Sequence, residues 1–137
     1  MTGNMITEAF DFIKENKDVA FATVGAGRPS LRVFQVMKID GHTLYFTTSA
    51  KKEVYRQLIE NPAVEILAFR ENVQVRMAGD VAFDVYEDIQ KEIFRTNPIL
   101  PDLYPSFDML VYFRMEVKFV EYYDLTPRPP KIECYNL

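Results

Sequence analysis

Several features that mark other classes of protein are scarce or missing in this sequence of 137 residues. Cys134 is the only cysteine, so an intrachain disulfide is excluded and a reducing compartment is expected. The chain opens without the charged and apolar regions of a signal peptide, and no apolar run approaches the roughly 18 residues that span a bilayer. We therefore expect a cytoplasmic protein that does not enter a membrane.

Excess positive charge and the common catalytic motifs are also missing. The formal net charge is -4, which argues against nucleic acid and acidic membrane surfaces as partners. His42 is the only histidine, so a histidine-rich metal site is excluded, and its place beside an Asp-Gly turn favours an exposed turn residue over a catalytic base or haem ligand. No Walker A loop, G-x-G-x-x-G or G-x-S-x-G motif occurs. The sequence therefore assigns no catalytic residue and no metal ligand.

The composition is that of a folded globular protein. Hydrophobic residues make up 48% and charged residues 26% of the chain, which excludes a disordered chain. The sequence contains no repeat, low-complexity tract or linker. Residues 1–137 are expected to form one domain, which is long enough to bury a core of its own.

Alternation of apolar and polar residues predicts a protein made mainly of β-strands. The predicted strands are residues 19–24, 30–39, 42–48, 63–70, 72–84 and 108–125. Most of them follow one another through hairpin signals such as Asp40-Gly41. Because antiparallel sheets of this size avoid open edges by closing on themselves, we expect a six-stranded antiparallel barrel with peripheral helices. A dimer partner or a covering helix would explain why strand 19–24 is apolar on both faces.

Helices are predicted at the connections between these strands. Apolar residues recur at helical spacing over residues 5–16 and 85–95. Asp84 and Glu87 would form a capping box for the second of these helices. The proline-bearing segment 97–107 is predicted to be a loop, and the last residues form a polar tail.

A pair of lysines, Lys51 and Lys52, opens a further predicted helix that ends at an Asn-Pro sequence. The helix dipole already places about half a positive charge at this end, so two cations are unfavourable there. They form either a solvated basic pair or part of an anion site. Thr47, Thr48 and Ser49 come just before them, and hydroxyls, free helix amides and ammonium groups together suit a phosphate monoester better than a carboxylate.

Three further polar residues are candidates for the same site. Counted from the Asp-Gly turn, Arg32 would lie near the level of Thr48 and Ser49 across the hairpin, although an exposed strand arginine is the alternative. Gln35 and Gln74 interrupt apolar strand faces. Each amide would either bond to neighbouring backbone or bind a ligand that has both donors and acceptors along one edge.

Several short motifs occur here in a specific order. They are G-R-P at 27–29, R-V-F-Q-V at 32–36, an Asp-Gly turn, L-Y-F-T-T-S at 44–49, a lysine pair, and a helix that ends at N-P. This ordered set resembles the pyridoxamine 5'-phosphate oxidase-like family over residues 8–83. The resemblance implies the FMN-binding split barrel, which here would be a six-stranded antiparallel split β-barrel with peripheral helices.

The resemblance also implies a cofactor, a partner and a set of binding residues. The cofactor would be FMN, bound at two sites at the interface of a homodimer. The Thr-rich strand end and the lysines would hold its phosphate, the arginine-led strand would line the flavin, and Gln74 would reach it from the other subunit. The implied cofactor-binding residues are Arg32, Val33, Phe34, Gln35, Thr47, Thr48, Ser49, Lys51, Lys52 and Gln74.

The sequence departs from the vitamin oxidases of this family in three ways. Lysine stands first in the basic pair where they have arginine, the preceding loop is one residue shorter, and the C-terminal segment carries Arg128 but no histidine. Oxidation of pyridoxamine phosphate is therefore not expected as the main activity.

Three functional hypotheses follow. The first is an FMN-dependent oxidoreductase that acts on an unknown small substrate and an electron donor. The second is a non-catalytic protein that stores or senses flavin, deazaflavin or haem. The third is an anion-binding module without redox chemistry.

Overall fold

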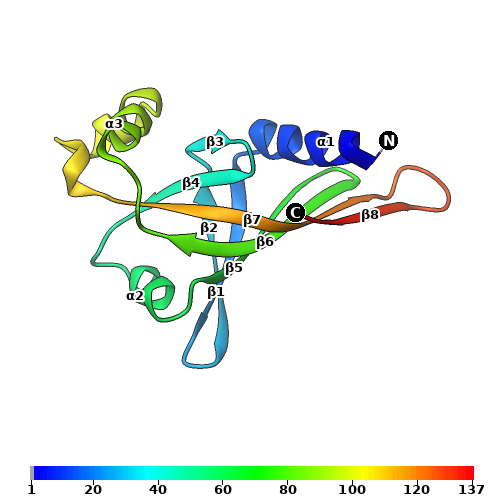
Figure 1. The fold of residues 1–137 in the computed structure, drawn as a ribbon, viewed down its shortest axis with the longest axis horizontal. Coiled ribbons are helices and arrows are strands. Elements are labelled where there is room, and N and C mark those ends of the chain that lie inside the picture. Colours follow the sequence, from blue (N-terminus) through cyan, green and yellow to red (C-terminus); the bar gives the residue numbers. More distant parts are fainter. Residues whose placement is uncertain (1) are drawn as a thin grey trace.

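Strands of alternating apolar residues assemble into one antiparallel sheet with helices at its periphery (Figure 1). The computed structural model describes the backbone of residues 2–137 and the side chains from residue 5 onward. The strands are β1 (Asp18–Gly25), β2 (Arg28–Gln35), β3 (Lys38–Asp40), β4 (Thr43–Thr48), β5 (Ala63–Arg70), β6 (Val73–Ala82), β7 (Val111–Asp124) and β8 (Lys131–Asn136). The helices are α1 (Thr2–Glu15), α2 (Glu53–Glu60), α3 (Glu87–Thr96), α4 (Ile99–Leu103) and a short 3-10 helix, η1 (Phe107–Met109).

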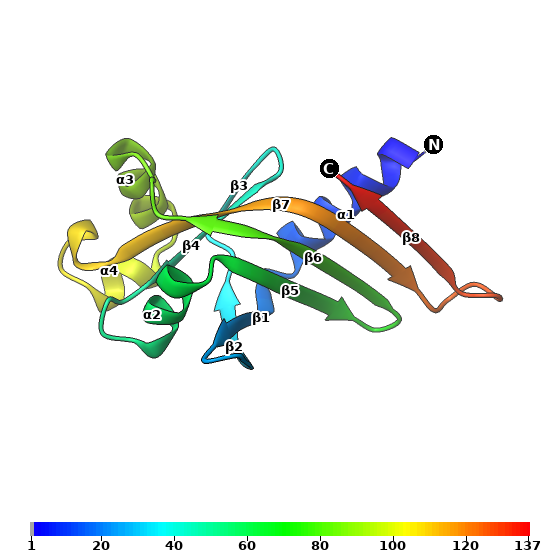
Figure 2. The ribbon, with the colours of Figure 1, turned by 60° about the horizontal axis from the view of Figure 1, so that its bottom comes forward.

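The sheet is curled but not closed. Its strands follow the order β2-β1-β5-β6-β7-β4-β3, and β8 pairs with β7 outside this path. No ladder joins β2 to β3 or β4 among the described residues, so one edge of β2 carries backbone groups without strand partners. This antiparallel sheet with a gap between its ends agrees with the expected split barrel. Figure 2 shows α2, α3 and α4 at one end of the sheet and β8 at the other.

The predicted number of six strands is wrong, because the sheet has eight. Range 30–39 divides into β2 and β3 where the backbone changes partners. The Val36 N–H donates to the Lys17 carbonyl (2.9 Å), and the next residue, Met37, donates to the Tyr45 carbonyl (2.8 Å). The second additional strand is β8, which lies in the segment expected to be a polar tail. It pairs with β7 along its whole length.

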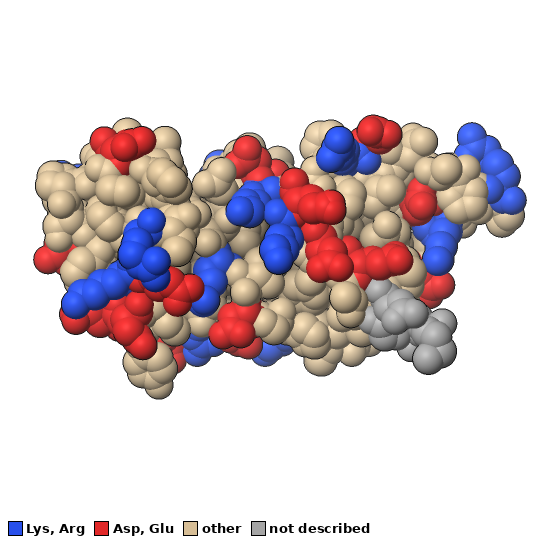
Figure 3. Space-filling model, turned by 90° about the horizontal axis from the view of Figure 1, so that it is seen from above, with Lys and Arg blue, Asp and Glu red and all other residues tan. Residues whose placement is uncertain are grey.

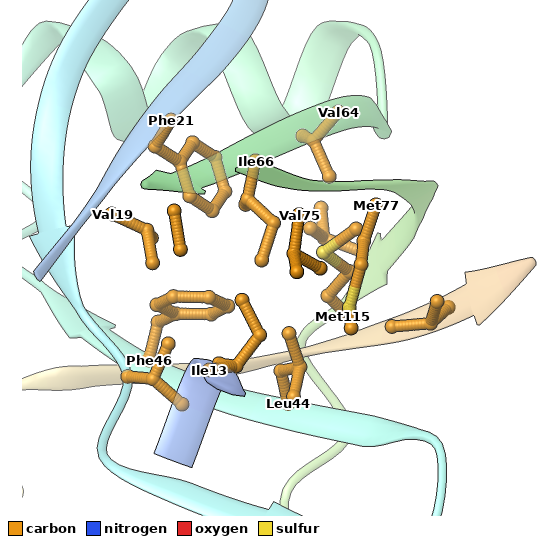
Figure 4. Close-up of a cluster of buried hydrophobic side chains, with 14 of the residues drawn as sticks. Ile13, Val19, Phe21, Leu44, Phe46, Val64, Ile66, Val75, Met77 and Met115 are labelled. Carbon is orange, nitrogen blue, oxygen red and sulfur yellow. The ribbon is translucent and has the colours of Figure 1, made fainter. Parts of the chain in front are cut away.

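One apolar core fills the barrel (Figure 4). Phe21, Phe46 and Phe113 are fully buried, and their ring centroids lie 5.1 Å (Phe21–Phe46) and 5.4 Å (Phe46–Phe113) apart. Ile13 of α1 and Leu44 of β4 lie in the same cluster. Burial of each such side chain contributes about 1.5–3 kcal/mol, so these residues explain why α1 stays against the sheet.

A β-bulge in the β6–β7 pair changes which side chains of β7 face the core. The register of β6 and β7 shifts between Ala78 and Gly79. A Cβ on Gly79 would lie 2.0 Å from the Glu116 carbonyl oxygen, so only glycine allows the two backbones to approach this closely. Beyond the shift, Val120 faces the core and Phe119 is half-exposed.

The predictions for residues 84–107 are partly wrong. Asp84 and Glu87 form no capping box, because α3 begins at Glu87 and its N-cap is Tyr86, which makes no side-chain capping bond. Instead the Asp84 carboxylate accepts two 3.0 Å hydrogen bonds from the Arg114 guanidinium. The segment expected to be a loop contains α4, and Leu100 of α4 is buried in a second apolar cluster together with α3.

Charged residues of both signs share the surface. On the face shown in Figure 3, basic and acidic side chains lie beside one another and do not form one continuous basic area. Across residues 2–137, no helix combines the length and apolar character needed to span a bilayer.

Candidate functional site

A cavity of about 360 Å³ lies along the open side of the barrel, where β2, β4, the start of α2 and α4 meet. It brings together most of the residues that the sequence assigns to a binding site. These residues are Arg32, Val33, Phe34, Gln35, Thr47, Thr48 and Lys52. The other three candidates, Ser49, Lys51 and Gln74, are not among its lining residues.

Arg32 reaches the site by a different route from the one expected. β2 pairs with β1, and Phe21 is the cross-strand partner of Arg32, so Arg32 does not lie across a hairpin from Thr48 and Ser49. Arg32 and Thr48 come together because β2 and β4 border the same cavity. The prediction that Arg32 lies near Thr48 is correct, but the hairpin pairing from which it was made does not exist.

The Arg32 guanidinium is held by neutral acceptors. Its Nη1 donates to Thr23 Oγ1 (2.8 Å) and to the Phe21 carbonyl (3.1 Å), and its Nη2 donates to Gln57 Oε1 (3.0 Å) and Ser30 Oγ (2.8 Å). Burial lowers the pKa of Arg32 from its ordinary value, because removing water disfavours the charged form. The charge of this cation therefore lacks a counterion among the described residues.

The start of α2 supplies a second polar cluster. Lys52 is the N-cap residue of α2 and makes no side-chain capping bond, because its ammonium group can only donate hydrogen bonds and helix amides need an acceptor. The first amides of a helix have no partners within the helix. Before the helix, the Lys52 N–H donates to the Ser49 carbonyl (3.0 Å), and the Lys51 N–H donates to Ser49 Oγ (3.2 Å). Ser49 thus shapes the turn that leads into α2.

Thr48 carries an unpaired polar atom beside these groups. Its side chain is only 4% exposed, and its hydroxyl oxygen is buried without a hydrogen-bond partner among the described residues. Leaving such a group unpaired costs about 1–3 kcal/mol. A buried hydroxyl at the edge of a cavity is the arrangement expected where a ligand supplies the missing partner.

The two glutamines do not occupy the environments expected from the sequence. Gln35 is exposed and donates to Asp18 Oδ1 (3.2 Å), so it is not a buried amide. Gln74 is also exposed and lies on β6 between Phe69 and Tyr123 of the neighbouring strands. The apolar face of β2 that carries Gln35 points outward, whereas Gln74 lies on the polar face of β6, and the apolar face of that strand points into the core. The alternation in β2 was correctly detected, but it could not say which face is the interior, and in β6 Gln74 does not interrupt the apolar face.

An apolar wall completes the cavity. Ile99, Leu100 and Leu103 of α4, together with Tyr104 and Leu110, line the side that faces β2. Sequence reasoning missed these residues because three prolines in this region were taken to exclude a helix. The apolar residues at 99, 100 and 103 have helical spacing, which could have revealed the short helix.

A larger cavity of about 590 Å³ lies on the outer face of the sheet and is a weaker candidate. Small residues such as Ala22, Ala78 and Gly79 line it. Two of its charged residues, Lys118 and Asp80, form an ion pair with each other (3.1 Å). Unlike the smaller cavity, it contains no buried polar side-chain atom that lacks a partner in the described structure.

Metal binding and histidine chemistry find no support at the site. No group of three or more His, Cys, Asp or Glu side chains in the described chain is arranged to hold a metal ion. His42 does not line the cavity, and its ring stacks on Phe10 with centroids 5.1 Å apart. What the cavity offers is a cationic and hydroxyl-bearing end next to an apolar wall.

The chain matches the model of a known protein family. Residues 5–120 match the sequence model described as pyridoxamine 5'-phosphate oxidase. No match was found among curated protein sequences.

Solved structures share the fold. A NimC/NimA family protein from Clostridium acetobutylicum is 24% identical, with a TM-score of 0.77, and the match covers 96% of this chain and 91% of that one. A protein from the same organism related to general stress protein 26, of the pyridoxinephosphate oxidase family, is 15% identical with a TM-score of 0.82 and coverage of 100% and 97%. A pyridoxamine 5'-phosphate oxidase-related, FMN-binding protein from Nostoc punctiforme is 16% identical with a TM-score of 0.71 and coverage of 97% and 88%.

Proposed function

The chain belongs to the pyridoxamine 5'-phosphate oxidase family, and we propose that it is a flavoprotein that binds FMN in the cavity between β2 and β4 and acts as an oxidoreductase on a small substrate. The phosphate of FMN would lie at the end bordered by Arg32, Thr48 and Lys52. The Nostoc punctiforme protein of the same fold, which is an FMN-binding protein, supports the choice of cofactor.

The unpaired hydroxyl of Thr48 is the observation that carries this proposal. It is buried, it has no partner in the described chain, and it belongs to a residue that borders the cavity together with Lys52. A phosphate monoester has several acceptor oxygens and nearly two negative charges at neutral pH. It would therefore accept the hydroxyl's hydrogen bond, meet the ammonium group of Lys52 and interact with the free amides at the start of α2.

The remainder of the cavity suits a ring system with polar edges. β2 ends the sheet path, and one of its edges has no neighbouring strand, so backbone donors and acceptors are available there. Val33, Phe34 and Gln35 of β2 line the cavity opposite the apolar residues of α4. When bound, FMN would supply hydride or electron transfer. The role of these residues would be to bind the ring, orient it and exclude water from one side.

We further propose that the active form is a homodimer. Leu31 and Val33 on β2 are 71% and 67% exposed. Across β1 they lie opposite Ala22 and Ala20, and Ala20 lies opposite Leu67 of β5. These residues form an apolar strip on the outer face, which a second copy would cover. A dimer would also give Gln74 a role, because it lies outside the cavity of its own chain.

The proposed dimer is tested by sedimentation of the wild-type protein and of Leu31→Glu. The wild-type protein should sediment with twice the mass of one chain. Leu31→Glu should shift it towards the monomer and weaken FMN binding, because it places a charge in the apolar strip. Ile132→Glu is a matched control, since Ile132 is 54% exposed on β8. A wild-type monomer that binds FMN fully would contradict the dimer.

The proposed cofactor is tested by absorption spectroscopy and by titration with FMN and riboflavin. The purified protein should keep a flavin band through gel filtration, and FMN should bind more tightly than riboflavin, which lacks the phosphate. Lys52→Ala should lower FMN affinity by roughly tenfold or more, because a hydrogen bond to a charged group contributes about 1.5–3 kcal/mol. Riboflavin affinity should stay unchanged.

Lys14→Ala is the charge-matched control, because Lys14 is an exposed lysine that borders a different cavity. A protein that ignores added FMN, or that binds FMN and riboflavin equally, would contradict the proposed site. Reduction of the bound flavin by NADH or NADPH, followed by reoxidation with turnover, would support the oxidoreductase. Bound flavin that neither reductant reaches would contradict this part of the proposal and leave a flavin-binding protein.

A further inference from the structure

We propose that Gln57 of α2 is a positioning residue that fixes the orientation of Arg32 while leaving its positive charge free for the ligand. This inference rests on the proposed function, in which Arg32 borders the end of the cavity that takes the FMN phosphate. Nothing in the sequence motifs singles out Gln57. It becomes visible only through its contacts with Arg32 and Thr23.

Arg32, Thr23 and Gln57 form a closed ring of hydrogen bonds. Arg32 Nη1 donates to Thr23 Oγ1 (2.8 Å), the Thr23 hydroxyl donates to Gln57 Oε1 (2.6 Å), and Arg32 Nη2 donates to the same Oε1 (3.0 Å). Because two donors converge on Oε1, only the amide oxygen can face the arginine. The ring therefore fixes both the side-chain amide and the plane of the guanidinium.

The surroundings of the ring are built to keep it in place. Thr23 is only 2% exposed, so its hydroxyl has no competing contact with bulk water. Gly25 lies directly against the Gln57 side chain, and a Cβ at this position would lie 2.8 Å from Gln57 Nε2. A glycine at position 25 thus leaves the space that Gln57 occupies. The ring connects β1, β2 and α2, three elements that are distant in the sequence.

The neutrality of the ring is its important chemical property. The remaining acceptors of Arg32 are the Phe21 carbonyl and the carbonyl and hydroxyl oxygens of Ser30, which are also neutral. Desolvation thus acts on Arg32 without the compensation of a carboxylate, and its pKa is lowered. A glutamate at position 57 would have nearly the same shape and would bring its own negative charge. Gln57 therefore leaves the counterion to be supplied by a ligand.

The substitution that tests this inference is Gln57→Glu, compared with wild type in titrations with FMN and with riboflavin. The variant should lose roughly tenfold or more in FMN affinity, because an internal carboxylate would compete with the phosphate for Arg32. Riboflavin affinity should stay unchanged, and the decrease of FMN affinity with added salt should become less steep. A purely structural role of Gln57 would not alter this selectivity between the two flavins.

Asn61→Asp is the matched control, because Asn61 is the C-cap of the same helix. Its Oδ1 accepts a hydrogen bond from the Ala63 N–H (3.1 Å), which an aspartate would preserve. This variant has the same change in net charge, and its FMN affinity should equal that of wild type. Thermal unfolding of each apo-protein shows whether the variants are folded.

If Gln57→Glu does not fold, Thr23→Val is used to test the role of the hydrogen-bonded ring. It removes the hydroxyl from the ring without altering α2 and should lower FMN affinity severalfold, whereas Thr23→Ser should restore it. A wild-type protein that prefers FMN over riboflavin, with a folded Gln57→Glu that keeps the same preference, would overturn the inference and leave the phosphate site intact. A wild-type protein that binds FMN and riboflavin equally would overturn both the role of Gln57 and the proposed phosphate site.

Discussion

The two ends of β4 carry similar polar side chains that differ in whether they have hydrogen-bond partners. At its start, Thr43 donates to Glu116 (2.9 Å), and Arg114 pairs with both Glu116 and Asp84. At its end, the Thr48 hydroxyl has no hydrogen-bond partner among the described residues, and Arg32 across the cavity has only neutral ones there. The polar groups at the first end find their hydrogen-bond partners and counterions within the chain, and those at the second end do not.

The electrostatics of the two arginines reflect the same contrast. The hydrogen bonds from Arg114 to Asp84 raise the pKa of the Arg114 guanidinium, because a negative partner favours the charged form. Desolvation lowers the pKa of Arg32. Arginines within folded chains commonly pair with carboxylates, as Arg76 also does with Glu65 (2.9 Å). The proposed anion site rests on this difference, because Arg32 is held beside a cavity by neutral acceptors alone.

The largest expected effect comes from exchanging the two arginines for glutamine. Arg32→Gln should lower FMN affinity by roughly 10- to 100-fold, because it removes the uncompensated positive charge beside the proposed phosphate position. It should also lower the free energy of unfolding of the apo-protein by about 1–3 kcal/mol, because Thr23, Gln57 and the Phe21 carbonyl lose the hydrogen bonds that Arg32 donates. Titration with FMN and chemical unfolding of the apo-protein measure both quantities.

Arg114→Gln is the counterpart at the other end of β4. It should leave FMN affinity unchanged and lower the free energy of unfolding by about 1 kcal/mol, because Asp84 and Glu116 lose their partner. If both variants lost FMN affinity to the same extent, the contrast between the two ends would have no bearing on ligand binding.

The sequence predicted the fold well where local signals were strong. Alternation and the Asp-Gly turn located the β3–β4 hairpin, and the residues around 63–70 form β5 as predicted. The partner change at Val36 and Met37 was hidden, because the apolar alternation continues through it while the hydrogen bonds do not. The β8 strand was hidden for another reason. It is mostly exposed, so burial imposes no regular pattern on its sequence.

The candidate site was predicted in part for the same physical reasons. Thr47, Thr48 and Lys52 lie close together in the sequence, so helix-terminus chemistry could identify this cluster. The wall formed by α4 and the contact of Gln57 with Arg32 depend on how distant elements pack, and no local pattern encodes that. Gln35 was expected on an inner face because periodicity gives the spacing of a face but not its direction, whereas Gln74 lies with Arg76 on the polar face of β6 and interrupts no apolar face.

A smaller effect is expected from the two threonines at the ends of β4. Thr48→Val should leave the stability of the apo-protein unchanged or raise it by up to about 1 kcal/mol, because it replaces an unpaired buried hydroxyl with a methyl group of similar size. The same variant should lose roughly tenfold in FMN affinity, and Thr48→Ser should keep it. Thr43→Val should show the reverse pattern, with about 1 kcal/mol lost in stability and no change in FMN affinity, because its hydroxyl is already bonded to Glu116.

Thermal unfolding without ligand and FMN titration, applied to these variants, separate the two properties. Loss of apo-protein stability in Thr48→Val would mean that the hydroxyl has a partner within the chain, and the main support for a phosphate at this position would be gone. Unchanged stability with weakened FMN binding would mean that the missing partner is the ligand. A binding site is thus distinguished from a structural network by opposite effects at the two ends of β4: the Thr48 substitution weakens FMN binding, and the Thr43 substitution lowers stability.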